Sequence, residues 1–543
     1  MSQFYDQASL VLVPSGYRSG KIYSQKPLST SGELSFSRAS NATRVVLDAS
    51  GQQRLEKVRT NRVLQSNSFN TTWISTTTTL TSGQADPNGG TSGWRFLTTS
   101  AGGYIYQNSV LQSGVEMTAS VWVKSNTGSS QTFRFTANSG GQQSGVITAT
   151  TSWERVSWTF TSSGAGEILF GYNASTTLDL LIYGFQVETG VMTDYIATTS
   201  AAVSVGPVSG LPRLDYSGGA SCCSLLLEPQ RTNYWPYSEQ ISQWYAPADG
   251  VTLTSNTTET LSPEGYYNAS KIVVVGGNKR NYQITSSIAG TGTISLFVKA
   301  GTGTDISLLT SSGSVYVSFN ISTQVVTPTT GTGTITSYGN GWYRITATGT
   351  LGAGEVVQVV YGGSAGASFY IWGATVEQGA YSTSYINTLS SAVTRVADAA
   401  YKTGISSLIG QTEGTMFWDG TIDNFSNFAT LLSLEGVSNS FIYFISYSGG
   451  LTFEVRSNNI VSASYASAIT TGAHKIALAY NASQVAIYID GVSVYTDYSV
   501  TIPATSNLYL AGWSGYNQSI KTKQALLFKT RLSNADLATL TSL

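Results

Sequence analysis

Four acidic residues in the last part of the chain are of the type that hydrolyses glycosidic bonds: Asp419, Asp423, Glu435 and Glu454. Glycoside hydrolases hold two carboxylates roughly 5–10 Å apart. No two of these acids alternate along one face of a strand, and a turn containing Gly420 separates Asp419 from Asp423. We therefore predict no catalytic residue and expect that the protein is not an enzyme, with hydrolysis kept as the weaker alternative.

The sequence contains few residues or motifs that could bind a metal ion or a cofactor. The single histidine, His474, lies inside the strand-like run AHKIALAY, where we interpret it as structural. One histidine cannot form a His-rich metal site or a histidine relay. No glycine-rich loop joins a strand to a helix in the manner of a phosphate-binding loop. The sequence predicts no metal and no cofactor.

Binding chemistry is better supported, in an aromatic and amide segment near the C-terminus. Trp513, Tyr516 and Asn517 fall within WSGYNQ, which we expect at one end of a sandwich. Aromatic faces with polar edges suit sugar rings and protein contacts. These three residues are the candidate glycan site, and burial of Trp513 in a core is the alternative.

A second candidate is a run of cations in a chain that is otherwise poor in charge. It comprises Arg38, Arg44, Arg54, Lys57 and Arg59, followed by Arg62. Residues 1–62 bury little core by themselves and need something to pack on. We expect an N-terminal docking region whose cations pair with acidic groups on a partner, and a solvated face is the alternative.

The composition sets the class of protein. Charged residues make up 10% of the 543 residues, against about 25% in ordinary proteins, and the net charge is −1. A nucleic-acid binder would show a basic footprint, so no nucleic-acid partner is expected. No run of about 20 apolar residues occurs and no secretory signal is visible, so no membrane insertion is expected. The Ser-, Thr-, Asn-, Gly- and Tyr-rich surface favours strands and turns.

The chain contains a duplicated segment, shown by residues that recur in the same order. The matches are Arg59-Thr60-Asn61 with Arg231-Thr232-Asn233, Ser66 with Ser238, Trp73 with Trp244, Val123-Lys124 with Val298-Lys299, Trp153-Glu154-Arg155-Val156 with Trp342-Tyr343-Arg344-Ile345, Val187-Glu188 with Val376-Glu377, and Tyr195-Ile196 with Tyr385-Ile386. Recurring tryptophans indicate shared core packing, and the recurring glutamates indicate a structural role.

Strand-like runs divided by Gly and Ser turns predict an all-β protein of tandem β-sandwich (jelly-roll) domains with an extended N-terminal arm. Asp490-Gly491 predicts a two-residue hairpin turn, and Ser533 predicts the cap of a short terminal helix. We divide the chain into the docking region 1–62, module 1 at 63–205, a connector at 206–235, module 2 at 236–398 and a different sandwich at 399–543. The connector holds Cys222 and Cys223, which we interpret as free thiols, with bridging between copies as the alternative.

Two parts of the chain resemble known families. The phrases GTMFWD, HKIALAYNASQVAIYIDGVSV and LFKTRLSNADLATL resemble concanavalin A-like, laminin-G-type sandwiches. The phrases LVPSGYRSGKIYSQKP, FSRASNATRV, LLLEPQRTN and VEQGAYSTSYINTLSSAVTRVAD resemble head and tail fibre proteins of tailed phages of Bacteroides-type hosts, with carbohydrate-binding-module-like jelly rolls.

The second resemblance implies a bacteriophage virion protein, a fibre or capsid decoration that is assembled in the host cytoplasm and exposed on the virion surface. It implies partners among capsid, portal or tail proteins, a homo-oligomer that is most often a trimer, and binding of host surface polysaccharide during adsorption. A purely structural spacer without a ligand and a glycan depolymerase stay as alternatives. The residues alone leave open head or tail location, glycan identity and bound calcium.

Overall fold

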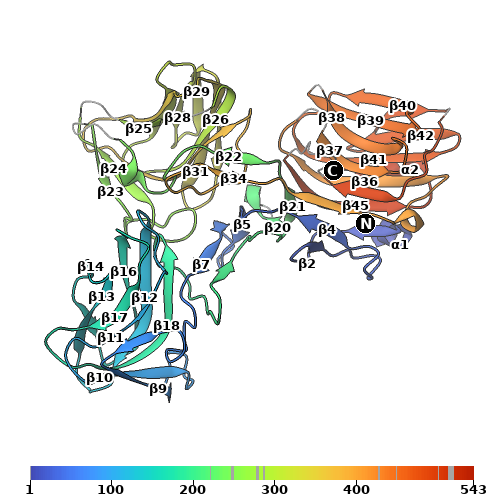
Figure 1. Cartoon of the computed structure of the whole chain (residues 1–543). Coiled ribbons are helices and arrows are strands. Elements are labelled where there is room, and N and C mark those ends of the chain that lie inside the picture. Colours follow the sequence, from blue (N-terminus) through green and yellow to red (C-terminus); the bar gives the residue numbers. More distant parts are fainter. Residues whose placement is uncertain are drawn as a thin grey trace.

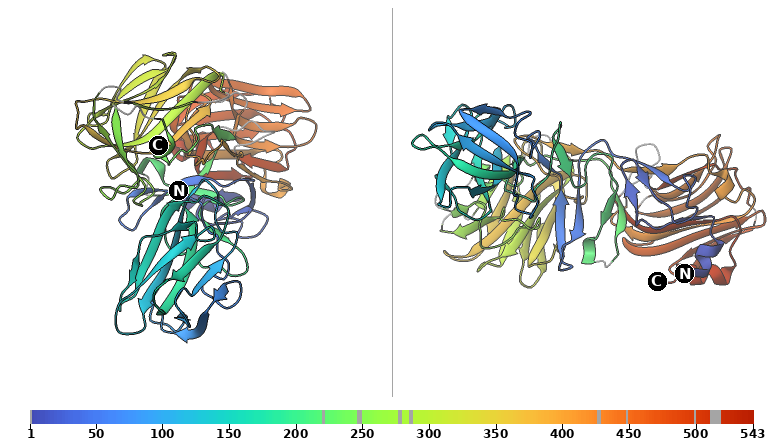
Figure 2. Two further views of the ribbon diagram at one scale, coloured as in Figure 1. Left: turned by 60° about the vertical axis from the view of Figure 1, so that its left-hand side comes forward. Right: turned by 90° about the horizontal axis from the view of Figure 1, so that it is seen from below.

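The computed structural model describes residues 2–219, 222–245, 250–276, 280–284, 288–425, 429–447, 449–498, 500–510 and 519–543. Antiparallel strands build three sandwich bodies, two on one side of the molecule and the third on the other (Figure 1). In the right-hand view of Figure 2, two of the bodies lie together at one end and the third lies at the other end, with strand pairs between them. The predicted all-β class of tandem sandwiches is confirmed.

Module 1 is a sandwich of two antiparallel sheets. Its strands are β8 (Ile74–Thr76), β9 (Thr78–Gln84), β10 (Gly93–Thr98), β11 (Tyr104–Gln107), β12 (Glu116–Ser125), β13 (Gln131–Ala137), β14 (Gln142–Gln143), β15 (Ile147–Ala149), β16 (Glu154–Thr161), β17 (Ile168–Tyr172) and β18 (Asp179–Thr189). One sheet has the order β16-β12-β18-β10-β9 and the other β14-β13-β17-β11-β8, with β15 paired to β13. Phe133, Phe170 and Phe185 meet between the sheets, because alternate residues of each strand point inward.

Module 2 repeats this arrangement. Its strands are β23 (Val251–Thr254), β24 (Ser270–Val274), β25 (Arg280–Ile284), β26 (Gly290–Ala300), β27 (Asp305–Thr310), β28 (Tyr316–Asn320), β29 (Val325–Thr330), β30 (Thr332–Ser337), β31 (Trp342–Leu351), β32 (Val356–Tyr361) and β33 (Ser368–Gln378). The order β10-β18-β12-β16 recurs as β24-β33-β26-β31, and β11-β17-β13 recurs as β25-β32-β27. A bulge occupies the same place in both modules, after Ser120 and after Ser295, so the two modules share this irregularity as well as their strand order.

The recurring polar residues hold equivalent places in the two copies. The Asn61 side chain donates to the backbone oxygens of Phe185 and Ile196, at 3.1 and 2.7 Å. Asn233 makes the same pair of bonds, to Ala374 and Ile386, at 3.1 and 2.7 Å. Glu188 and Glu377 are buried in both copies and accept from Thr193 and Thr383, which confirms their structural role.

The third body is a larger sandwich. Its C-terminal strands are β35 (Ala399–Lys402), β36 (Gly414–Ile422), β37 (Ala429–Glu435), β38 (Phe441–Tyr447), β39 (Gly450–Ser457), β40 (Ile460–Ser467), β41 (Gly472–Asn481), β42 (Gln484–Ile489), β43 (Val492–Asp497), β44 (Asn507–Leu510) and β45 (Ile520–Phe528). We call this body, with every strand that joins it, the terminal sandwich. Asp490 and Gly491 form the predicted turn between β42 and β43, both with positive φ.

The structure corrects the expectation of an extended N-terminal arm. The elements at the start of the chain are α1 (Ser2–Gln7), β1 (Leu10–Leu12), β2 (Tyr17–Arg18), β3 (Lys21–Ile22) and β4 (Leu34–Ser37). Strand β1 pairs with β45, with Leu10 opposite Leu527, and β4 pairs with β35, with Phe36 opposite Ala400. Leu10 and Leu12 of β1 and the apolar side chains of β4 are buried in the core of the terminal sandwich, so this segment packs on that core.

The connector also contributes to this body. Its strands β20 (Arg213–Asp215) and β21 (Ser224–Leu227) extend one sheet in the order β20-β21-β45-β36-β41-β42-β43. Leu225 and Leu227 enter the core, and Leu226 is buried as well. The other sheet has the order β2-β3-β4-β35-β44-β37-β38-β39-β40. The terminal sandwich is therefore assembled from three separate stretches of the sequence.

Short strand pairs lead into and out of the two modules. They involve β5 (Thr43–Leu47) with β6 (Gln53–Lys57), β7 (Arg59–Asn61) with β19 (Val203–Val205), and β22 (Arg231–Asn233) with β34 (Val393–Arg395). The strand that enters each module thus pairs with the strand that leaves it. Short 3₁₀ turns lie at Ser217–Gly219, Ile241–Gln243 and Ser406–Leu408.

Both α-helices cover the outer face of one sheet of the terminal sandwich. The C-terminal helix α2 (Asn534–Thr541) begins at the predicted cap Ser533, whose hydroxyl accepts from the Asp536 amide at 3.1 Å. Phe4 of α1 and Leu540 of α2 belong to the same apolar cluster, so the two ends of the chain lie together (Figure 2). Among the described residues, no helix has the length and apolarity that a bilayer crossing requires.

Candidate functional site

The outer face of one module 1 sheet carries a groove of about 480 Å³, which we call the tyrosine groove. It spans β11, β17, β13 and β14, the sheet at the end of the molecule occupied by module 1 (Figure 1). Its lining residues are Tyr104, Tyr106, Asn108, Thr136, Ser139, Gly140, Gln143, Glu167, Leu169 and Tyr172. Leu169 and Thr136 are buried and form its floor.

The strand alternation of β11 places two tyrosines on this face. Ile105 is fully buried in the core, so its neighbours Tyr104 and Tyr106 point outward and stay half-buried. Their ring centroids are 6.0 Å apart and the ring planes are inclined by 55°. Tyr172, at the end of β17, adds a third half-buried ring to the lining. Such rings offer the flat apolar faces on which sugar rings stack.

The wall opposite the tyrosines is a tight loop between β13 and β14. Asn138, Ser139 and Gly140 all have positive φ, and the Asn138 side chain accepts from the Gly166 amide at 3.1 Å. Glu167 accepts a short hydrogen bond from the backbone amide of Ser139. These bonds hold the loop in place, so the groove is formed before any ligand binds.

The groove has hydrogen-bonding capacity that the fold does not use. Within the part of the chain that the structure describes, the Tyr104, Tyr106 and Tyr172 hydroxyls have no hydrogen-bond partner, and neither do the side-chain amides of Asn108 and Gln143. Hydroxyl and amide groups both donate and accept. A ligand rich in hydroxyl groups would meet uncommitted partners on both walls.

Module 2 differs at the corresponding face. Gln358 of β32 points outward there and is bonded to Arg280 of β25, with 2.9 Å between the guanidinium nitrogen and the amide oxygen. Ser307 of β27 is bonded to Ser318 of β28, with 2.9 Å between the hydroxyl oxygens. These outward polar groups, among the side chains that the structure describes on this face, are paired with one another, whereas those of the tyrosine groove stay available.

The predicted glycan residues Trp513, Tyr516 and Asn517 lie outside the described residues, and this prediction stays a prediction. The tyrosine groove was not predicted from the sequence. The available signal was the alternation Tyr104-Ile105-Tyr106 in a segment already expected to be a strand. It places two aromatic rings on the face opposite to the core.

The cations expected to dock on a partner have acceptors within the chain. Arg38, Lys57 and Arg59 are 2%, 8% and 8% exposed, too little to form a docking face, so the prediction is wrong for them. Arg59 binds Glu264 of module 2 at 2.8 and 2.9 Å, and Lys57 binds Glu239 at 2.6 Å.

The remaining two cations of this set are half-buried. The Arg44 side chain pairs with Glu56 across the β5–β6 hairpin, at 2.6 Å. The Arg54 guanidinium lies over the Tyr266 ring, 6.0 Å from its centroid. All five cations therefore contact other parts of the same chain, and those of Arg54, Lys57 and Arg59 hold module 2 against the N-terminal strands.

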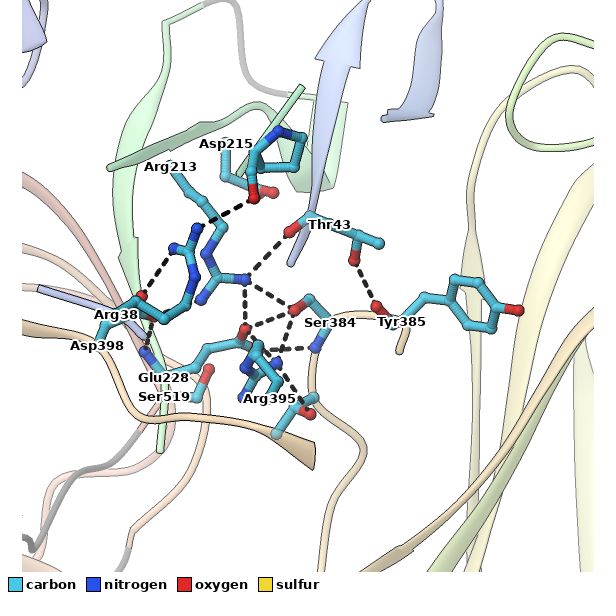
Figure 3. A network of polar contacts seen from close by, with 12 residues as sticks. Arg38, Thr43, Arg213, Asp215, Glu228, Ser384, Tyr385, Arg395, Asp398 and Ser519 are labelled. Carbon is cyan, nitrogen blue, oxygen red and sulfur yellow. Dashed lines mark hydrogen bonds and ion pairs between the residues drawn. The ribbon is translucent and has the colours of Figure 1, made fainter. Parts of the chain in front are cut away.

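A buried ion network, which we call the hub, joins the segments that meet beside the terminal sandwich (Figure 3). It consists of Arg38, Arg213, Arg395, Glu228 and Asp398. Their side chains are at most 3% exposed. Arg213 binds both Glu228, at 2.7 Å, and Asp398.

The electrostatics of the hub are consistent with a structural role. Burial alone would raise the pKa of Glu228, but the ion pairs with Arg395 and Arg213 lower it well below its usual range. Burial lowers the pKa of Arg38 to about 10, although Asp398 opposes this shift. Glu228 therefore remains charged at neutral pH, and the ion pairs of Glu228 and Asp398 link the N-terminal strands, the connector and the segment after module 2.

The residues considered for catalysis are engaged in structural contacts. His474 lies 2.8 Å from Asp490 and 2.9 Å from the Thr470 carbonyl oxygen, between the ends of two strands. Asp423 binds Lys521 at 2.9 Å, and Glu454 binds Arg456 at 2.6 Å. Asp419 accepts from Gln524 and Glu435 from Ser433, each at 3.0 Å. No group of three His, Cys, Asp or Glu residues that could hold a metal ion occurs in the described ranges.

Fold and site together define a protein of three β-sandwich bodies with an open aromatic groove on module 1. No family model matches the sequence, and the search of curated proteins gave no match. Among solved structures, the Ruminococcus gnavus IT-sialidase CBM40 bound to α2,3-sialyllactose is 17% identical, with a TM-score of 0.23, over 26% of this chain and 91% of that one.

Two further structures match at the same level. A leech intramolecular trans-sialidase is 17% identical, with a TM-score of 0.22, over 25% of this chain and 24% of that one. The binding domain of Paraclostridial Mosquitocidal Protein 1 is 12% identical, with a TM-score of 0.23, over 26% of this chain and 43% of that one. The functional assignment therefore depends on the geometry of the groove itself.

Proposed function

We propose that the protein binds glycans through the tyrosine groove of module 1. The observation that carries this proposal is the combination of three half-buried tyrosine rings with uncommitted hydroxyl and amide groups in one preformed groove. Sugar rings present apolar faces edged by hydroxyl groups. They match a site in which apolar faces and a few polar groups converge.

The test is a glycan array probed with the full-length protein, followed by calorimetric titration of the strongest ligands. The double variant Tyr104→Ala, Tyr106→Ala removes two of the rings. We expect affinity to fall at least about tenfold, because truncating an aromatic contact residue at the centre of a site costs about 1–2 kcal/mol or more.

The matched control is Tyr316→Ala, which truncates an exposed tyrosine on β28 of module 2. It should leave glycan binding unchanged, and thermal unfolding should show that all variants remain folded. Glycan binding that survives the double variant at full strength would place the ligand elsewhere on the protein and contradict the proposal.

We propose binding rather than hydrolysis at this site. Glu167 is the single Asp or Glu side chain among the lining residues, and one of its oxygens already accepts from Ser139. Glycosidases use a pair of carboxylates. Release of reducing sugar from any glycan that binds would show instead that the groove is catalytic.

We propose further that the protein is displayed on the surface of a phage virion, where it contacts host polysaccharide during adsorption. This proposal is supported by the resemblance of the N-terminal and module phrases to phage fibre proteins. Immunogold labelling with an antibody to the protein should decorate phage particles at regular positions and distinguish head from tail. Label confined to the host cell would contradict it.

The same resemblance supports a homotrimer. Light scattering should then give about three times the chain mass of 57.5 kDa. A monomeric mass would contradict the trimer and would leave the proposed glycan binding by the tyrosine groove unaffected. A virion-bound protein that binds no glycan would favour the second candidate function, a structural spacer whose sandwiches contact only capsid, portal or tail proteins.

A further inference from the structure

We infer that the tyrosine groove selects uncharged sugar chains and rejects chains that carry carboxylate or sulfate groups. This inference rests on the proposed function and concerns the same site. It follows from the charge of the groove walls, from the orientation of one carboxylate and from the kind of donors that surround it.

The walls of the groove carry a single formal charge, and it is negative. Glu167 is the only Asp, Glu, Lys, Arg or His residue among the lining residues. The other polar groups there are neutral hydroxyls and amides, including Asn108 and Gln143. A ligand in the groove therefore meets a negative potential that no lining cation offsets.

Glu167 has one oxygen to offer a ligand. Its Oε1 accepts from the Ser139 amide, which fixes the carboxylate against the loop. Its Oε2 has no hydrogen-bond partner among the described residues. An ionised carboxylate only accepts, and it accepts strongly from hydroxyl groups. A sugar hydroxyl can supply that donor, whereas a ligand carboxylate or sulfate cannot and is repelled by the like charge.

The cation on the neighbouring part of the sheet does not change this balance. Arg134 of β13 donates to the backbone oxygen of Ser144 and is not among the lining residues. Sites that recognise anions usually aim an arginine or lysine at the ligand. Glu167 is therefore a specificity-determining residue, and its charge distinguishes neutral from anionic glycans.

The test uses the full-length protein and matched pairs of probes: lactose with 3′-sialyllactose, and galactotriose with trigalacturonic acid, alongside the glycan array. We expect the neutral member of a pair that binds to bind at least about tenfold more tightly than its anionic member at low salt. The difference should shrink as salt is added, because salt screens the repulsion.

The variant Glu167→Gln removes the charge and keeps an oxygen that can accept from Ser139. We expect it to reduce the ratio of neutral to anionic affinity at least about threefold, with Gln143→Glu as the matched change that increases the ratio. An unchanged ratio in Glu167→Gln would overturn the inference.

The failures of the two proposals are distinguishable. Preferential binding of anionic glycans that is lost in Tyr104→Ala, Tyr106→Ala would overturn the selectivity and leave the proposed function intact. Absence of binding to every glycan on the array, or binding insensitive to that double variant, would overturn the groove assignment and the selectivity with it.

Discussion

Arg213 and Asp398 form an ion pair whose two side chains are 0% exposed, although 185 residues separate them in the sequence. Arg213 lies on β20, and Asp398 lies immediately before β35, so the pair ties the connector to the start of the C-terminal part of the chain. Arg38 binds the other oxygen of Asp398 at 3.0 Å. This carboxylate is therefore shared by two guanidinium groups.

The hub contains three cations and two acids, so we expect the loss of one acid to destabilise the protein strongly. Asp398→Asn leaves three buried guanidinium groups with Glu228 as their one carboxylate. Uncompensated buried charge is costly, so we expect the free energy of unfolding to fall by about 3–5 kcal/mol. Urea denaturation of the full chain measures this. Glu259→Gln, which breaks the exposed pair with Lys271, should cost less than about 1 kcal/mol, and equal losses in the two variants would contradict the prediction.

Glu228 should make stability depend on pH with a definite sign. Its pKa in the folded protein lies below the unfolded value of about 4.3, because ion pairs with Arg395 and Arg213 outweigh burial. Its stabilising contribution is therefore complete above about pH 4.3 and is lost as the pH falls further. The difference in unfolding free energy between the wild type and Glu228→Gln should shrink from pH 5 to pH 3. A constant difference would show that Glu228 does not titrate in this way.

Glu377 should make stability depend on pH in the opposite direction. Burial raises its pKa, and the favourable contacts with Arg344 and Thr383 only partly offset this. The folded state therefore takes up a proton at higher pH than the unfolded state, and stability increases as the pH falls toward about 4.3. Relative to Glu377→Gln, the wild type should gain stability from pH 7 to pH 4 in the same urea titrations. If the difference in unfolding free energy instead changes with pH in the direction predicted for Glu228, burial does not raise the pKa of Glu377 in the way proposed.

The C-terminal segment should not fold well by itself. Residues 399–543 lack β1, which covers β45, and β4, which covers β35. Unpaired strand edges and exposed core residues promote aggregation. We expect this fragment to be aggregated or partly unfolded by circular dichroism and light scattering, while the full chain is stable. A monomeric fragment with a cooperative thermal transition would show that the N-terminal strands are dispensable.

Two places compete for the glycan, and single variants separate them. If the tyrosine groove is the site, Tyr106→Ala should weaken binding about tenfold or more and Trp513→Ala should leave it unchanged. Titration of one array-selected glycan into both variants decides between them. The reverse result would favour the aromatic segment predicted from the sequence near the C-terminus.

Local patterns predicted the strands, the turn at Asp490 and the cap at Ser533, because each depends on neighbouring residues. The duplication also located Trp73 and Trp244 in cores, as the structure confirms. Trp342 is buried likewise, whereas its counterpart Trp153 is only half-buried.

Partners distant in sequence could not be predicted in the same way. The apolar run of β1 shows that this strand is buried, but not that it pairs with β45, more than 500 residues later. Likewise, the cations near the N-terminus could be recognised as a group, yet their acceptors lie in separate segments. The tyrosine groove escaped prediction because alternation separates two faces of a strand without telling which outer face stays open.

The pairing of entry and exit strands around each module has a consequence for how such a protein can diversify. Both modules begin and end at adjacent strands, β7 beside β19 and β22 beside β34, so each is an insert whose chain enters and leaves the host domain at one place. An insert of this kind can be replaced as a unit without interrupting the strands of the host domain. We expect a chimera that replaces only the residues between β7 and β19 to change which sugars are recognised, while both chain ends and whatever they anchor stay as they are.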